Sequence, residues 1–472
     1  MNKETRIQKI QEIVERDKNN PFGRQEIHWE DRLVPMEVYK IPLDYLVYNK
    51  YNGRILSRTK SLERRDCSIE AETDKGKRLI EKLLWNSKPD RNKKTHESIE
   101  EYGQKKIGII TKDGIIIDGN RRAMLLNKID KFDYFKAVVL PVTLEEKPLE
   151  IEKLETSYQM GEDEKLGYPP IEKYLKSKDL YIKLNENRLY EIGEVNEEAI
   201  KKISDWIGES RSTIKEYLEV MTVMDDYLDY LGYNGIYTQL DGREDQFINL
   251  MKWLNNFYGE GSIKAFDGYK NSDVDDLKII SFDYIRTKYE GKKFRYIADG
   301  LKENHFFGNK SIWSDFKDYH FNNISIIKDK EKKIDFDFKN LEAYLNDRDT
   351  KFEEKSIKHL NENIDSCYQQ LRYKKSADEP KKLVSDAKRA LEAINQTHES
   401  FSTPEVLDQL ESVNQMTSDI LKNKSPKRLL TQVLSLLKKV NIENAEEERE
   451  EMLEEVSKIN KVSFEMKKYL GG

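Results

Sequence analysis

The chain has few cysteines and no long apolar run. Its 472 residues include two cysteines, Cys67 and Cys367, which excludes a disulfide framework, a cysteine-based zinc set and a dithiol redox pair. The six histidines show no spacing typical of a zinc site. Segment 1–20 is charged throughout, and no run approaches the ~20 apolar residues that span a bilayer. We therefore expect a cytoplasmic protein without a membrane segment.

Excess charge of one sign is also missing. The net charge is −6 although 36% of the residues are charged, so any surface for nucleic acid must be a local patch. Aromatic residues make up 10% of the chain, and because such rings need burial, this content excludes general disorder. The length predicts about three folded domains.

The N-terminal third has the pattern of a small α/β domain. Segment 107–117 consists of two β-rich runs around Asp113-Gly114, which predicts a hairpin. A helix is expected at 121–129 and a further strand at 135–142. Two prolines bracket a short extended segment at 36–41, and 1–18 has the apolar spacing of an amphipathic helix.

Beyond residue 142 the pattern is helical, apart from a glycine-rich loop at 258–273. Apolar stripes at 406–421 and 429–440 predict two amphipathic helices, and an acidic run follows at 443–455. We predict an α/β domain followed by a mainly helical domain and a helical C-terminal region. The expected parts are an N-terminal helix (1–19), the α/β domain (20–145), a helical domain (146–255), a mixed segment (256–330) and the C-terminal region (331–472).

The turn after the predicted hairpin carries the clearest chemical pattern. An apolar strand ends at Asp118-Gly119, and Arg121 and Arg122 open the next helix. Glycine lets an anion approach the backbone, and the arginines add charge-assisted donors. A plain strand-to-helix turn with two solvated arginines is the alternative. Asp118 could hold Mg²⁺ or act in catalysis, or it could cap the helix.

Three stretches resemble the nucleotide-binding domain of ParB-type partition proteins, in the ParB/sulfiredoxin superfamily. They are 95–122, with the G-x-R-R turn; 41–55, beginning Ile41-Pro42-Leu43; and 154–174, beginning Leu154-Glu155-Thr156. The resemblance implies a nucleoside triphosphate (CTP, ATP or GTP) with Mg²⁺, and Glu155 near the metal. It implies nucleotide contacts from Gly119, Asn120, Arg121, Arg122, Arg54 and Gln159.

The turn departs from the partition proteins at two positions. Asn120 stands where that family usually has an acid, and Asp118 where it usually has a small residue. A D-G-x-x-R turn is similar instead to superfamily relatives in DNA-modification and phage-defence systems, some of which hydrolyse nucleotides or cut DNA. The turn lacks the reactive cysteine of sulfiredoxin, which excludes that activity.

A helix-turn-helix is expected at 197–220. Gly208 breaks the segment, and Ser210 is placed to cap the second helix. Segment 197–219 holds six acids and four bases, which is unfavourable for phosphate contact, so a purely structural role is the alternative. The residues that the second helix would present to DNA are Arg211, Ser212, Thr213 and Lys215.

Two further stretches are basic. Segment 50–65 has six bases and one acid, and 74–94 has eight bases and three acids. Arg58 and Arg64 in the first stretch are candidates for DNA contact, and a solvated loop is the alternative.

The favoured hypothesis is nucleotide-dependent DNA binding by a homodimer that closes when the nucleotide binds. The second is a nuclease or NTPase effector in a phage-defence or DNA-modification system, with Asp118 catalytic. The third is a helical scaffold with a vestigial nucleotide site, which assembles with a partner protein encoded nearby.

Overall fold

The chain forms two compact units, Met1–Ala377 and Asp378–Gly472. The computed structural model describes residues 1–64, 68–158, 169–191, 193–259, 261–289, 291–331, 333–335, 341–377, 379–422, 426–440 and 449–471. Within these ranges, no helix combines the length and the apolar character that a membrane-spanning segment needs. Cys367 is buried, and Cys67 lies outside the described residues.

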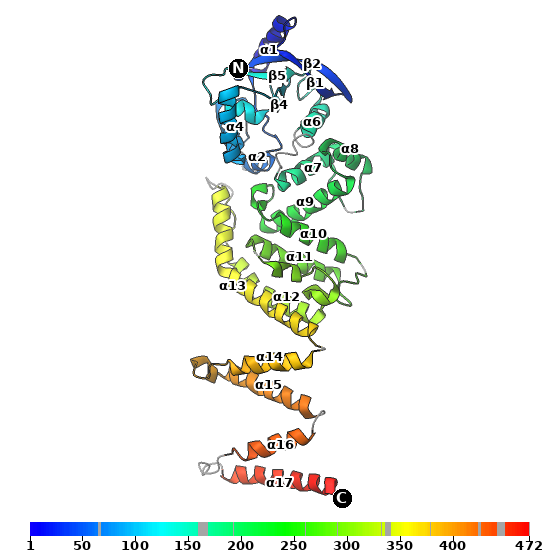
Figure 1. Ribbon diagram of the computed structural model, residues 1–472, viewed down its shortest axis with the longest axis vertical. Coiled ribbons are helices and arrows are strands. Elements are labelled where there is room, and N and C mark those ends of the chain that lie inside the picture. The colour runs from blue at the N-terminus through cyan, green and yellow to red at the C-terminus, as the bar shows by residue number, and fades with distance from the viewer. Residues whose placement is uncertain are drawn as a thin grey trace. The chain divides into compact units, whose positions relative to one another are not determined.

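Unit 1 begins with a mixed five-stranded sheet of order β1-β2-β5-β3-β4 (Figure 1). β3 runs parallel to β5, and the other neighbours are antiparallel. The predicted hairpin is confirmed as β3–β4, whereas β1 was not predicted. The free edge of β4 is closed by a bridge between Val47 and Ile115. The strands are β1 (Gly23–Trp29), β2 (Arg32–Pro42), β3 (Gly108–Ile110), β4 (Ile116–Asp118) and β5 (Tyr134–Val139).

Helices cover both faces of this sheet because the side chains of each strand alternate between two cores. Ile110 and Ile116 point into one core with α1, α3, α4 and α5, whereas Ile109 and Ile117 point into the other with α6. The predicted α/β arrangement is thereby confirmed. The helices here are α1 (Lys3–Asp17), η1 (Leu43–Tyr45), α2 (Leu56–Glu63), α3 (Asp74–Ser87), α4 (Pro89–Tyr102), α5 (Asn120–Leu126) and α6 (Pro148–Thr156).

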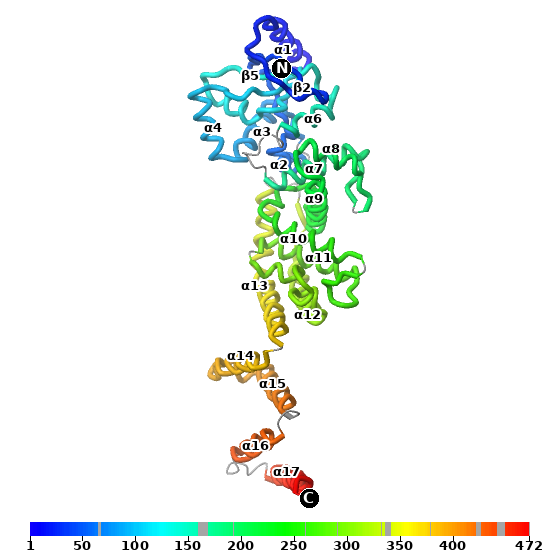
Figure 2. The backbone as a smooth tube through the Cα atoms, turned by 45° about the vertical axis from the view of Figure 1, so that its right-hand side comes forward, coloured from blue at the N-terminus to red at the C-terminus, as the bar shows by residue number. Residues whose placement is uncertain are grey.

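The rest of unit 1 is helical. Its large core runs from Leu56 to Leu371, through the predicted boundaries at 255 and 330, and a smaller core from Leu180 to Leu218 lies between α7, α8 and α9. The 35-residue helix α13 packs along α12 and contacts α11 (Figures 1 and 2). The elements are α7 (Pro170–Leu184), α8 (Glu197–Ile207), α9 (Arg211–Leu231), η4 (Tyr237–Leu240), α10 (Glu244–Phe257), α11 (Asn271–Arg286), η5 (Lys292–Tyr296), η6 (Lys302–Asn304), η7 (Phe306–Gly308), α12 (Lys310–Asp329) and α13 (Leu341–Lys375).

A buried charge network joins α13 to this core. Asp349 Oδ1 accepts from Arg286 Nε at 2.8 Å and from the Tyr233 hydroxyl at 2.7 Å. Asp349 Oδ2 lies 3.5 Å from Arg243 Nη2. Both arginine side chains are at most 4% exposed. Because buried charges are costly unless paired, this network fixes how α13 seats on its neighbours.

Unit 2 consists of helices whose apolar side chains remain largely exposed. The helices predicted from the two apolar stripes are confirmed as α15 and α16, and the acidic run continues into α17 after 441–448, which lie outside the described residues. The elements are α14 (Pro380–Glu392), η8 (Glu399–Ser402), α15 (Pro404–Lys422), α16 (Pro426–Leu437) and α17 (Arg449–Gly471).

Candidate functional site

Gly119 forms the turn between β4 and α5, as predicted. Its φ of 104° lies in the left-handed region, which side-chain-bearing residues rarely adopt. A Cβ at this position would also lie 2.6 Å from Cζ of Phe135. Glycine is therefore required here for two independent steric reasons.

Asp118 and Arg122 form a half-buried ion pair across this turn. The α5 N-terminus has no side-chain cap, so the predicted capping role of Asp118 is wrong. The Arg122 guanidinium is thus paired with the carboxylate that was predicted to hold Mg²⁺ or to act in catalysis. Asp118 thus fixes Arg122 on the first turns of α5.

Asn120 is buried and satisfied inside the fold. Its Oδ1 accepts from the Asn49 backbone N–H at 2.9 Å, and its Nδ2 donates to the Ile116 carbonyl at 3.0 Å. Both ends of the amide are thus engaged within the protein. Asn120 holds the segment at Asn49 against the turn, which is a positioning role, and its predicted nucleotide contact stays a prediction.

Arg121 reaches the corner between α3 and α4. Its Nε and Nη2 donate to Asn92 Oδ1 at 2.9 and 2.6 Å. Asn92 Nδ2 in turn donates to the carbonyls of Leu84 and Trp85, in the last turn of α3. The turn at Gly119 and the α3–α4 corner are therefore locked together.

Four cationic side chains gather at this corner, from three separate segments. Burial, followed by the positive charges of Arg54, Arg91 and Arg121, lowers the pKa of Lys88. Arg91 is exposed and the other three are half-buried. We call Arg54, Lys88, Arg91 and Arg121 the cation cluster. Lys88 and Arg91 were not predicted individually, although both lie in the basic stretch 74–94.

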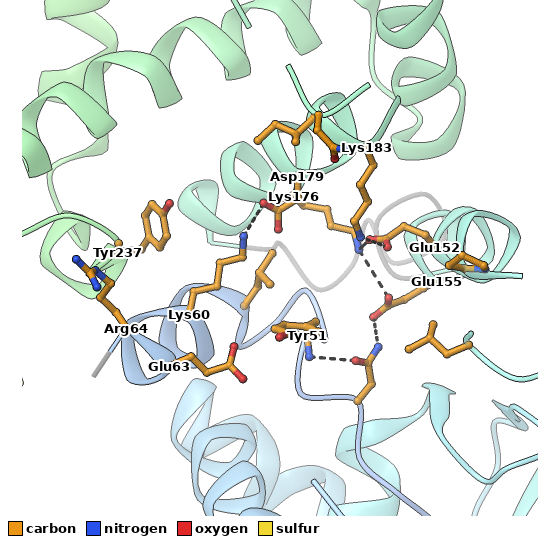
Figure 3. A pocket seen from close by; sticks show the side chains of 17 residues that line it. Tyr51, Lys60, Glu63, Arg64, Glu152, Glu155, Lys176, Asp179, Lys183 and Tyr237 are labelled. Carbon is orange, nitrogen blue, oxygen red and sulfur yellow. Dashed lines mark hydrogen bonds and ion pairs between the residues drawn. The ribbon is translucent and has the colours of Figure 1, made fainter. Parts of the chain in front are cut away.

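A cavity of about 670 Å³ opens on the other side of Asn49, between α2, α6 and α7 (Figure 3). Asn49 Nδ2 donates to Glu155 Oε1 at 3.0 Å, while its backbone N–H binds Asn120. Asn49 thus joins the wall of the cavity to the turn at Gly119. Tyr51, Leu56 and Tyr237 supply aromatic and apolar lining.

The far wall of the cavity is a buried ion network (Figure 3). Lys176 Nζ lies 2.6 Å from Glu152 and 3.7 Å from Glu155, and Lys183 also pairs with Glu152. Burial opposes ionisation of Glu152, yet Lys176 and Lys183 lower its pKa to about 2. Burial likewise opposes the charge on Lys176, but Glu155 and Glu152 raise its pKa. Glu152 and Lys176 are therefore both charged at neutral pH.

This arrangement does not fit a metal at Glu155. The carboxylate already binds Asn49 and faces the Lys176 ammonium, which would repel a divalent cation. In the described part of the chain, no three His, Cys, Asp or Glu side chains are grouped so as to hold a metal. The prediction that Glu155 lies near a metal is thus without geometric support. Gln159, predicted to contact the nucleotide, lies outside the described residues.

Helix α2 connects this site to the helical part of unit 1. At its first turn, the backbone N–H and hydroxyl of Ser57 donate to the buried Glu172 of α7 at 3.0 and 2.6 Å. Burial raises the pKa of Glu172 to about 7, although the hydrogen bonds from Ser57 and the charge of Arg58 act in the opposite direction. Glu172 thus ties α2 to α7.

The arginines of α2 are engaged within the protein. Arg58 pairs with Asp241 at 3.0 Å, and Arg64 Nε donates to the Asn234 carbonyl at 3.1 Å. Lys60 pairs with Asp179 of α7 at 2.6 Å. The guanidinium groups predicted to contact DNA therefore serve the packing of α2 against the helical part.

The predicted helix-turn-helix geometry is present in α8 and α9. Gly208 ends α8 with a φ of 77°, and the Ser210 side chain caps α9 by accepting from Thr213 N–H. Arg211 and Ser212 are exposed at the start of α9, whereas Lys215 pairs with Glu197 at 2.6 Å. The carboxylates of segment 197–219 are Glu197, Glu198, Asp205, Glu209, Glu216 and Glu219.

No family model matches the chain, and no curated protein or solved structure was found to be similar to it.

Proposed function

We propose that the α/β part of unit 1 binds a nucleoside triphosphate, with its phosphates at the cation cluster. The observation that carries this proposal is the convergence of Arg54, Lys88, Arg91 and Arg121 beside the Gly119 turn. A group of cations from three segments creates a positive local potential that attracts a polyanion. Arginine adds paired donors that match phosphate oxygens. Arg122, held by Asp118, lies on the same turn.

The cavity supports a nucleoside rather than phosphate alone. Its volume of about 670 Å³ lies within the range of small-molecule sites, and Tyr51 and Tyr237 provide surfaces suited to a base. Asn49 contacts both the cavity wall and the turn, so a ligand bound at either place would shift Asn49. The lining does not distinguish CTP from ATP or GTP. Asp118 and Glu155 each face a cationic side chain of this chain. The proposed nucleotide binding therefore uses neither carboxylate as a metal ligand.

Nucleotide occupancy would reach the helical part through α2. This helix directly follows Arg54, and its side chains bind α7 and the residues around η4. A shift of α2 would therefore move α7, which packs on both α8 and α9. The ligand would in this way change the position of α8 and α9, which form the helix-turn-helix.

We expect Arg121→Ala to weaken triphosphate binding by about 2–3 kcal/mol, roughly a 30- to 150-fold rise in Kd. The exposed Arg91→Ala should cost about tenfold and leave the fold intact. Isothermal titration calorimetry with CTP, ATP, GTP and UTP, each with and without Mg²⁺, measures both. Arg32→Ala, exposed on β2, is the control. Absence of heat with all four nucleotides would overturn the proposal.

A second candidate function is DNA binding by α8 and α9. The capped turn and the exposed Arg211 and Ser212 favour it, because a recognition helix presents its N-terminal residues to base edges. A nuclease or NTPase has no such support, because the carboxylate of Asp118 is paired with Arg122.

If this second function holds, Arg211→Ala with Lys215→Ala should abolish retardation of duplex DNA in a mobility-shift assay. Wild-type affinity should fall steeply with salt, since phosphate contacts release counterions. Arg16→Ala, exposed on α1, should bind as wild type does. Equal binding by the double variant would assign α8 and α9 a structural role.

A further inference from the structure

Helix α17 carries a mainly apolar stripe that the rest of unit 2 leaves largely exposed. Its positions recur at alternating intervals of four and three residues, the repeat of a coiled-coil seam. Val456 is 58% exposed, Met466 48% and Leu470 75%. The stripe is Met452, Val456, Ile459, Ser463, Met466 and Leu470.

Contact within the chain covers the stripe only in part. Leu430 of α16 lies across from Met466 and Leu470, and these residues line an open apolar pocket of about 410 Å³. Isolated helices depend on packing of their apolar face for most of their stability. Another helix is therefore expected to complete this seam.

The distribution of charge along α17 indicates which helix would complete the seam. Segment 449–455 holds four glutamates and one arginine, whereas 458–468 holds four lysines and one glutamate. A parallel pair of α17 helices would align like charges, and an antiparallel pair aligns opposite ones. The helix is therefore complementary to a reversed copy of itself.

We propose that α17 pairs antiparallel with α17 of a second copy of this chain. When Ile459 is placed opposite Ser463 of the second copy, Val456 meets Met466 and Met452 meets Leu470. In the same register, Glu455 flanks the seam at the level of Lys467 of the other helix. A two-fold axis near residue 461 relates the two helices, so each contact occurs twice. This pairing is independent of the nucleotide proposal.

The test is the mass of the full-length protein by sedimentation equilibrium. We expect a dimer in which Val456→Glu with Met466→Glu raises the dissociation constant more than about a hundredfold. Glu455→Lys should weaken dimerisation several-fold, and adding Lys467→Glu should restore it, because both positions flank the seam. Lys461→Glu, on the outer face of the seam, is the control. Circular dichroism checks that helicity is retained.

Three outcomes would overturn the pairing. A monomeric wild type excludes it. A dimer that survives Val456→Glu with Met466→Glu uses another surface. A dimer that keeps its full affinity when the glutamate charge is reversed is parallel or joined elsewhere.

Discussion

Asp349→Ala is expected to lower the free energy of unfolding of unit 1 by about 3–5 kcal/mol, because it removes a carboxylate that two buried arginines share. Arg286 is fully buried and donates to Asp349 Oδ1. Nη2 of Arg243 lies 3.5 Å from the other carboxylate oxygen of Asp349. Removing the carboxylate leaves Arg243 with hydrogen bonds to backbone carbonyls and Arg286 with Glu331 as its remaining carboxylate partner. The substitution should also loosen α13, whose buried face begins near this network.

Urea denaturation followed by tryptophan fluorescence measures this effect, because all five tryptophans of the chain lie in unit 1. Asp347→Ala is a matched control two residues away on α13, since Asp347 is 57% exposed and forms an ion pair with Lys351, one turn along the same helix. Surface changes of this kind stay within about 0.5 kcal/mol. Equal stability of the two variants would show that the network contributes little.

Unit 1 should lose stability as the pH rises from about 4.5 to about 7, owing to Glu172. Burial is the main cause of its raised pKa of about 7, against an ordinary value of 4.5. The folded state therefore binds the proton more tightly, so the contribution is full below pH 4.5 and disappears as pH passes 7. A shift of this size corresponds to about 3 kcal/mol.

Glu172→Gln should remove this part of the pH dependence, because glutamine cannot ionise but keeps an oxygen for Ser57. Urea midpoints at pH 5, 6, 7 and 8 give the slope for wild type and variant. Glu97→Gln, exposed on α4, should keep the wild-type slope. An unchanged slope in Glu172→Gln would show that Glu172 is ionised across this range.

Local patterns predicted local structure well. The Asp113-Gly114 hairpin, the Gly119 turn and the helix pair around Gly208 all depend on residues within a few positions of one another. β1 was missed because its sequence is polar, with only Ile27 and Trp29 buried. A polar edge strand lacks the periodic apolar pattern by which strands are recognised.

The site itself depended on tertiary contacts. Lys88 and Arg91 join Arg121 only because α3 and α4 form a corner, which residue spacing does not reveal. Arg58 was assigned to DNA by its charge, but its partner Asp241 lies 183 residues away. Charge alone predicts that an arginine will find an anion. It does not predict whether that anion is phosphate or a carboxylate of the same chain.

The two outer edges of the sheet are protected in different ways. At β4 the chain itself supplies an extra pairing partner, since Val47 N–H donates to the Gly114 carbonyl and Ile116 N–H donates to that of Val47. At β1 the exposed Arg24, Glu26 and His28 surround the open backbone groups with polar side chains. Strand-by-strand addition of another molecule is therefore blocked at one end of the sheet and costly at the other. Self-association of this chain is therefore expected to use helical surfaces rather than the edges of the sheet.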